Sequence, residues 1–232
     1  MNIENVILRC TNVQKVFSTN RKTDAGLHVL KGIDLEIHKG ELISIVGASG
    51  AGKSTLLHIL GGLDRPTDGE VYWGDTNISK IADEKLARLR TREVGFVFQY
   101  HHLLPEFSAQ ENIAIPHMIL GQSMKASNEV AIKYLKMVGL EERATHKPSE
   151  LSGGEQQRVA IARAIANQPR IVLADEPTGN LDSTTALDLF NIILELNRVN
   201  RQTFVLVTHN EKLAEKTHRV MLIEDGRIRK IS

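Results

Sequence analysis

One eight-residue segment constrains the fold most strongly: residues 47–54 read GASGAGKS, which has the spacing G-x-x-x-x-G-K-[S/T]. It follows the apolar run LISIV at 42–46, typical of a central strand covered on both faces, and precedes the helical pattern STLLHILGG. Glycines let backbone N–H groups curl around phosphate oxygens, and the helix directs the positive end of its dipole at the same place. The segment therefore predicts a phosphate-binding loop (P-loop) within an α/β fold.

The residue types of this loop suit a nucleoside triphosphate with a metal ion. Lys53 can reach the β- and γ-phosphates as a compact cation, and the Ser54 hydroxyl can ligate Mg²⁺. A glycine-rich turn with an incidental lysine would match the spacing in about one chain of this length in a hundred. The residues that we expect to contact the nucleotide here are Gly47, Ser49, Gly50, Ala51, Gly52, Lys53, Ser54 and Thr55.

Two carboxylates follow a second buried strand, because residues 171–176 read IVLADE. Asp175 is placed to hold Mg²⁺ through a water molecule, and Glu176 to orient and polarise the attacking water. Phosphoryl transfer depends on positioning and charge stabilisation, so one metal holder and one water-positioning group suffice. A solvated strand end would explain the DE pair alone equally well, but its combination with GASGAGKS favours the catalytic interpretation.

Apolar runs and helical patterns alternate along the chain, with a loop expected at 18–26. Strands are expected at 6–10, 33–37, 42–46, 70–73, 94–98, 171–175, 203–208 and 220–224. Helices are expected at 54–62, 82–93, 111–120, 128–140, 155–167, 183–199 and 211–217. The alternation predicts one α/β domain, 1–232, with a mostly parallel central sheet. The strand-poor stretch 99–165 is expected to be a helical subdomain inserted into a core formed by 1–98 and 166–232.

Composition narrows the classes of partner and the compartment. Acidic and basic residues nearly cancel, leaving a formal net charge of +1, which does not favour a nucleic-acid binder. The single cysteine, Cys10, cannot form an internal disulfide. The N-terminus lacks the pattern of a signal peptide, and no apolar run approaches the ~18 residues of a membrane span. We therefore expect a cytoplasmic protein that meets a membrane only through a partner.

The segment LSGGEQQR at 151–158 places a serine and two glycines at the start of a helix. Backbone N–H groups, a hydroxyl and the helix dipole make an anion-binding site there. An ordinary helix cap, with Ser152 as N-cap and Glu155 at the capping-box position, is the alternative. Followed by VAIARA and LADEPTGNLD, the segment resembles the signature of the ABC ATPases, and the resemblance covers essentially the whole chain. It implies their fold, in which antiparallel N-terminal strands accompany the mostly parallel P-loop core.

The resemblance implies that ATP is buried between two head-to-tail copies of the chain. In that family Ser152, Gly153 and Gly154 would contact the γ-phosphate of ATP held on the P-loop of the other copy. Asp182, in GNLD, matches the aspartate of a loop that crosses the dimer interface. One chain then cannot complete a site, and a homodimer in the ATP-bound state is part of the mechanism.

Three further positions are assigned by the same resemblance. Gln99 matches the glutamine that senses Mg²⁺ and the γ-phosphate at the junction of the core and the helical subdomain. His209, in LVTHN, matches the switch histidine that contacts the γ-phosphate. Phe17 lies where the family usually has a tyrosine stacked on adenine, and phenylalanine keeps the ring without the hydroxyl. Its alternative is a core residue flanking the first strand.

The segment YHHLLPEFSAQENIAIP at 100–116 resembles the lipoprotein-releasing ATPases of the LolD type. This resemblance implies two integral membrane permease subunits, LolC/LolE-like, and a peripheral location on the cytoplasmic face of the inner membrane. MacB-like efflux ATPases and the FtsE-like cell-division ATPases remain alternatives. We expect a MacB-like chain to continue into membrane segments, whereas this sequence ends after IRKIS.

Two rival functions come from other classes. ABC ATPases that act on DNA carry long coiled-coil insertions between the P-loop and the second acidic motif, and those that act on ribosomes usually hold two such domains. Neither feature is present in this sequence. A scaffold that binds ATP without useful hydrolysis is the second rival, and the presence of Glu176 and His209 weighs against it.

Overall fold

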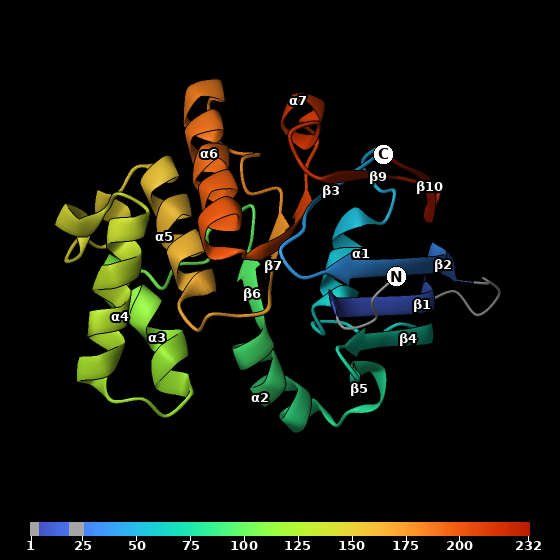
Figure 1. Cartoon of the computed structure of the whole chain (residues 1–232), viewed down its shortest axis with the longest axis horizontal. Coiled ribbons are helices and arrows are strands. Elements are labelled where there is room, and N and C mark those ends of the chain that lie inside the picture. The colour runs from blue at the N-terminus through green and yellow to red at the C-terminus, as the bar shows by residue number, and fades with distance from the viewer. Residues whose placement is uncertain (1–4, 19–25) are drawn as a thin grey trace.

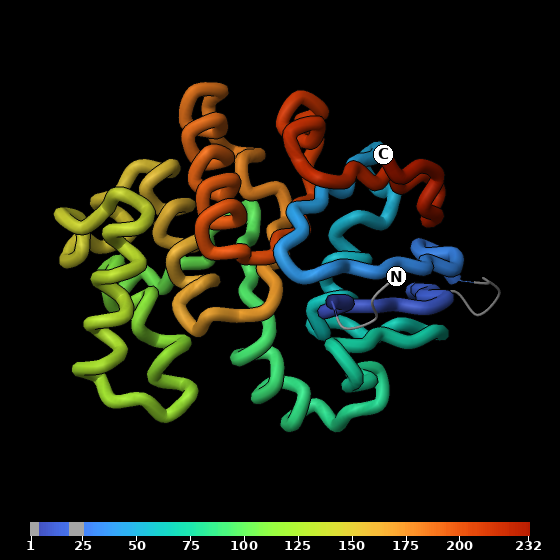
Figure 2. Tube along the Cα trace, in the orientation of Figure 1, coloured from blue at the N-terminus to red at the C-terminus, as the bar shows by residue number. Residues whose placement is uncertain are grey.

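The computed structural model describes residues 5–18 and 26–232. All but the two ends of the loop expected at 18–26 lie outside these ranges. The chain enters the helical part of the molecule once, after the strand that ends at Val97, and returns once to the sheet at Ile171 (Figure 2). The helical part is therefore one continuous segment of the chain.

A six-stranded sheet lies at the centre of the molecule (Figure 1). In spatial order its strands are β10 (Arg227–Ile231), β9 (Arg219–Glu224), β3 (Leu42–Val46), β8 (Thr203–Val207), β7 (Ile171–Asp175) and β6 (Val94–Val97). Every neighbouring pair is parallel except β9 with β10. The mostly parallel central sheet is thus confirmed, and the carboxyl ends of β3, β7 and β8 meet at one edge.

A second, four-stranded sheet is antiparallel and occupies the blue and teal part of Figure 1. Its strands, in spatial order, are β2 (Leu27–His38), β1 (Val6–Phe17), β4 (Asp68–Trp73) and β5 (Thr76–Asn77). Cys10 pairs with Leu35 of β2 and with Val71 of β4. The expected antiparallel N-terminal strands are confirmed, and both β1 and β2 are much longer than the apolar runs at 6–10 and 33–37.

In the part of the chain that the structure describes, seven α-helices accompany the sheets. They are α1 (Lys53–Leu60), α2 (Asp83–Glu93), α3 (Ala109–Ile119), α4 (Met124–Met137), α5 (Gly153–Ile165), α6 (Ser183–Asn200) and α7 (Glu211–Ala214). Short 3₁₀ turns lie at Ile78–Lys80, Glu141–Arg143 and Pro148–Glu150. Helices α3, α4 and α5 pack on one another, in the green and yellow part of Figure 1. Within residues 5–18 and 26–232, no helix is both long and apolar enough to cross a bilayer.

Alternate residues of the central strands enter two separate apolar cores. Leu42 and Phe204 pack with residues of α3, α4, α5 and α6, whereas Ile43 and Val205 pack with α1 and the antiparallel sheet. Successive side chains of a strand point to opposite faces, so a sheet covered on both faces needs continuous apolar runs. This explains why LISIV and TFVLV contain almost no polar residue.

Candidate nucleotide-binding site

The P-loop turns between β3 and α1 through conformations that favour glycine. Gly47 has φ 150° and Gly52 has φ 101°. A Cβ atom on Gly47 would lie 2.2 Å from the carbonyl oxygen of Ile223, and one on Gly52 would lie 2.8 Å from Cδ2 of Leu30. Both the backbone conformation and the neighbouring atoms therefore exclude a side chain at these two positions. A cavity of about 260 Å³ borders the loop between Ala48 and Ala51.

Lys53 is the first residue of α1, at the end of the loop, and is only 5% exposed. Its Nζ donates to the carbonyl oxygens of Gly47 and Ala48, both at 2.9 Å. Burial lowers the pKa of Lys53, while the charges of Glu176 and Asp175 act in the opposite direction. The loop thus holds the Lys53 ammonium group against two of its own carbonyl oxygens. When a nucleotide binds, the same N–H donors can bond instead to phosphate oxygens, which carry more negative charge.

The end of β7 brings the first carboxylate to the P-loop. Ser54 Oγ donates to Asp175 Oδ1 at 3.0 Å, across 121 residues of sequence. A hydroxyl and a carboxylate are the oxygen ligands that Mg²⁺ prefers, and this ion commonly binds to one or two such groups with water and substrate phosphates supplying the rest. The donor set therefore fits a magnesium ion, and the assignment of this site remains a prediction.

Glu176 and His209 contact each other beside this pair. The distance between His209 Nε2 and Glu176 Oε1 is 2.6 Å. Glu176 has φ 47°, an uncommon conformation for a residue with a side chain, and its N–H donates to Val207 O at 2.9 Å. This backbone bond ties the residue after β7 to the end of β8. The structure therefore brings together the two side chains that the sequence predicts to act on water and on phosphate.

Gln99 follows β6 and reaches the same region. A Cβ atom on Gly179 would lie 3.2 Å from Gln99 Nε2 and 3.3 Å from Glu176 Oε2, so both side chains border this glycine. Gln99 Nε2 donates to Asn180 Oδ1 at 3.1 Å, and Asn180 Nδ2 donates back to the Gln99 carbonyl at 3.3 Å. Sequence reasoning did not single out Asn180, although it lies in the same GNLD segment as Asp182.

The signature segment forms the N-terminus of α5, and Ser152 is its N-cap. Ser152 Oγ accepts from the N–H of Glu155 at 3.3 Å, and the Ser152 N–H donates to Glu155 Oε2 at 2.8 Å. This capping box is the structural alternative noted in the sequence, and it is compatible with anion binding. The hydroxyl hydrogen is not used in the cap, and the N–H groups of Gly153 and Gly154 have no acceptor within an α-helix.

Asp182 caps the neighbouring helix, α6. Its Oδ1 accepts from the N–H groups of Thr184 and Thr185 at 3.0 and 3.1 Å. The hydroxyl of Thr185, followed by these N–H groups, holds the pKa of Asp182 below its usual range. A Cβ atom on Gly154 would lie 2.4 Å from Cγ2 of Thr185, so the signature helix and α6 meet at this glycine. The role of Asp182 at a nucleotide remains a prediction.

The two parts of the expected ATP site do not meet within one copy. In Figure 1, α5 lies in the helical part, α1 lies behind the antiparallel strands, and β6 and β7 separate them. The P-loop and the signature residues thus lie on elements that β6 and β7 separate in this view.

The comparisons with known proteins decide the family. The sequence pattern of the ABC transporter family matches residues 30–179. The chain belongs to this family. It is 50% identical to the lipoprotein-releasing system ATP-binding protein LolD of Legionella pneumophila (strain Lens), over 92% of this chain and 94% of the relative. For the protein of the same name from Idiomarina loihiensis the identity is 48%, over 97% of both chains.

Solved structures agree with this assignment. The ATP-binding cassette MJ0796, in a dimeric post-hydrolysis state bound to ADP and Pi, matches with a TM-score of 0.88 and 40% identity over 97% of both chains. The ABC ATPase family and fold predicted from the motifs are thereby confirmed.

Phe17, the last residue of β1, is the predicted site residue of this ABC cassette that precedes the P-loop in sequence. Its ring is 42% exposed, and Lys15 Nζ lies 4.9 Å from the ring centroid. The exposure rules out a core role, which was the alternative interpretation. Stacking on adenine remains a prediction.

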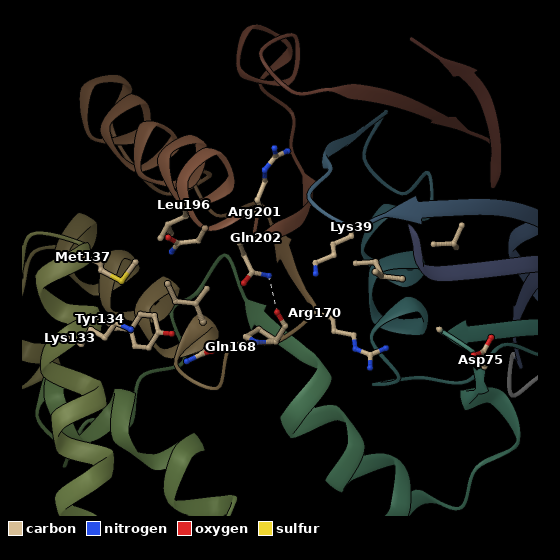
Figure 3. Close-up of a pocket in the computed structure, with 16 residues that line it drawn as sticks. Lys39, Asp75, Lys133, Tyr134, Met137, Gln168, Arg170, Leu196, Arg201 and Gln202 are labelled. Atoms are coloured by element: carbon tan, nitrogen blue, oxygen red, sulfur yellow. Dashed lines mark hydrogen bonds between the residues drawn. The ribbon is translucent and has the colours of Figure 1, made fainter. Parts of the chain in front are cut away.

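A large cavity lies away from the nucleotide residues. It has a volume of about 1090 Å³ and lies between the helical part and the core (Figure 3). Lys39, Arg170 and Gln202 line it, and they precede β3, β7 and β8. In a parallel sheet the amino ends of the strands lie opposite the carboxyl ends that carry Lys53 and Glu176. The cavity therefore belongs to the other edge of the sheet.

Proposed function

We propose that this ABC cassette binds MgATP between two head-to-tail copies and hydrolyses it to ADP and phosphate. The observation that carries the proposal is the gathering of Lys53, Ser54, Asp175, Glu176 and His209 at one sheet edge of a cassette whose signature helix starts elsewhere. A second copy, turned head to tail, supplies the missing signature groups. Dimerisation is thus a requirement of the chemistry.

In the proposed reaction each residue has a positioning or electrostatic part. Glu176 orients the attacking water, and its 2.6 Å contact with His209 fixes the carboxylate. Lys53 stabilises the transferring phosphoryl group, together with Ser152 and Gly154 of the second copy. A magnesium ion held by Ser54, Asp175 and Gln99 would neutralise charge on the phosphates.

We further propose that the dimer powers a separate permease of two integral membrane subunits, LolC/LolE-like, that releases lipoproteins from the inner membrane. Identities of 48–52% to LolD proteins over at least 88% of the chain support this. The segment after Gln99 exposes large apolar side chains, with Tyr100 67%, Leu104 43% and Phe107 40% exposed. These residues offer a contact surface for the permease, through which residues 99–165 transmit the ATP cycle to it. Attachment to the permease at this surface makes the chain a peripheral protein on the cytoplasmic face of the inner membrane.

An affinity pull-down from detergent-solubilised membranes tests the partner assignment. Glu176→Gln with MgATP should hold the dimer closed on its permease, and Glu195→Gln, an exposed change on α6, is the matched control. Recovery of two lipoprotein-release permease subunits with Glu176→Gln supports the proposal. Recovery of an efflux permease or a division protein moves the chain to the MacB-like or FtsE-like branch, and recovery of DNA or ribosomes alone contradicts a transport function.

A further inference from the structure

The irregular segment between β6 and α3, which contains Gln99, is held by side chains of the signature helix. Gln157 Nε2 donates to the carbonyl oxygen of Phe98 at 3.0 Å. Arg163 donates from Nη2 to the carbonyl oxygen of His101 at 2.8 Å and from Nη1 to that of His102 at 2.7 Å. Three hydrogen bonds thus connect α5 to both sides of Gln99.

Arg163 holds these carbonyls at an electrostatic cost. Burial lowers the pKa of its guanidinium. Among residues 5–18 and 26–232, none of the ion pairs involves Arg163. A partly desolvated cation compensated only by neutral carbonyls contributes little net stability. The planar guanidinium does fix two successive carbonyl groups at once, which a single ammonium cannot do in the same way. Its geometry therefore suits positioning better than stabilisation.

The helix that carries Arg163 is well placed to act as a rigid connector. Near its C-terminus α5 lies directly on β6, since a Cβ atom on Gly95 would be 2.2 Å from the Ala164 carbonyl oxygen. At its other end are the signature residues, since α5 begins at Gly153. The segment around Gln99 is therefore held by α5 at Gln157 and, in the last turn of the helix, at Arg163.

We propose that Arg163, assisted by Gln157, is a positioning residue that keeps the Gln99 segment and the signature helix together as one body. This inference rests on the proposed head-to-tail dimer. Gln99 serves the ATP site of its own copy, whereas the signature serves the site of the second copy. The connection therefore links the two ATP sites of a dimer, so that an occupied P-loop fixes the helix that must clamp the other nucleotide.

The test separates nucleotide binding by one copy from closure of two. In a Glu176→Gln background, Arg163→Met removes the donors, and Arg163→Lys keeps the charge with a less suitable geometry. Binding of a fluorescent ATP analogue is measured at a protein concentration where the chain is monomeric. Dimer formation is then followed by light scattering as MgATP is raised.

We expect analogue binding to stay within about two-fold of the parent, because the P-loop is untouched. The MgATP concentration for half-maximal dimer formation should rise about ten-fold or more for Arg163→Met. Without its bonds to the Gln99 segment, α5 must be ordered as the dimer closes, and this ordering costs free energy. Arg163→Lys should restore part of this shift. Arg90→Met is the matched control: Arg90 Nη1 also donates to a carbonyl oxygen, that of Gly62 at 2.7 Å, but in the core. It should leave the midpoint of dimerisation unchanged.

An unchanged midpoint for Arg163→Met would overturn the inference while leaving the proposed dimer intact. If the Glu176→Gln parent does not dimerise with MgATP, the proposed function itself is wrong. Thermal unfolding shows whether Arg163→Met is folded. Should it not be, Gln157→Met takes its place, because it removes only the bond to the Phe98 carbonyl; a shift of about three-fold is then expected, and no shift contradicts the proposal.

Discussion

The P-loop edge and the signature edge of this cassette are predicted to bind the same kind of anion by different means. At the P-loop edge, residues from β3, α1, β7 and β8 already contact one another, as the Ser54–Asp175 and Glu176–His209 distances show. At the signature edge, one helix N-terminus presents a hydroxyl and backbone N–H groups, with its cap satisfied within the same copy. In the proposed dimer the first edge binds ATP alone, and the second becomes useful only when another copy brings ATP to it.

This difference predicts where each mutation should act. Changes at the P-loop edge should affect the chemistry or binding of nucleotide by a single copy. Changes at the signature edge should spare that binding and affect only events that need two copies. The following predictions test this division, starting with the largest effect.

The largest effect is expected for Glu176→Gln at the P-loop edge. The amide cannot accept a proton from the attacking water, so steady-state ATP hydrolysis should fall by about 100-fold or more. ATP binding to the monomer should persist, because Lys53 and the loop backbone are unchanged. A phosphate-release assay beside an equilibrium binding measurement checks both. Equal loss of binding and hydrolysis would show that Glu176 holds the loop instead of the water.

A smaller effect is expected for Gly154→Ala at the signature edge. The new Cβ atom would lie 2.4 Å from Cγ2 of Thr185, so the start of α5 must move away from α6. We expect hydrolysis to fall about ten-fold with monomer binding of ATP unchanged. The double variant Gly154→Ala/Thr185→Ser removes the clashing methyl and keeps the hydroxyl that bonds Asp182. It should recover part of the activity; no recovery would show that the added Cβ interferes elsewhere.

The smallest effect concerns the stability of the signature cap. The bond from the Ser152 N–H, and then Arg143, hold the pKa of Glu155 below its usual range. A carboxyl whose folded pKa is lowered stabilises the fold above its unfolded pKa of about 4.3, and this stabilisation is lost as pH falls through the folded pKa. Glu155→Gln should therefore cost about 0.5–1 kcal/mol at pH 7, and the difference from wild type should shrink toward pH 3.

Urea unfolding at several pH values measures this difference. Glu84→Gln, in an exposed helical pair with Arg88, serves as the control on a helix surface. If Glu155→Gln is as stable as wild type at pH 7, the cap does not preform the signature. The signature edge would then depend on the second copy both for its ATP and for its own ordered conformation.

Much of this division could be predicted from the sequence, because its chemistry lies in contiguous motifs. GASGAGKS, IVLADE and LSGGEQQR each contain both the reactive groups and the glycines or apolar residues that set their local structure. The strands at 171–175 and 203–207 were predicted nearly to the residue, since continuous apolar runs mark buried strands.

What the sequence could not predict depends on contacts between distant residues. The strand β10 and the full lengths of β1 and β2 were missed, because polar residues on exposed strands extend only when a neighbouring strand pairs with them. The bonds from Arg163 to His101 and His102 join residues 62 and 61 positions apart. No local sequence pattern predicts such bonds, because in the sequence Arg163 resembles any polar residue of an amphipathic helix.

Cross-linking tests most directly whether the two edges complete each other across copies. Ser49→Cys on the P-loop and Ser152→Cys on the signature are combined in the Glu176→Gln background and treated with a short bismaleimide, with and without MgATP. Native Cys10 will not interfere, because it is buried and burial raises its pKa to about 12.

The account predicts a cross-linked product of two chains that forms with MgATP, joins Cys at position 49 of one copy to Cys at position 152 of the other, and is absent without nucleotide. A product of one chain, with both positions joined inside the same copy, would contradict it.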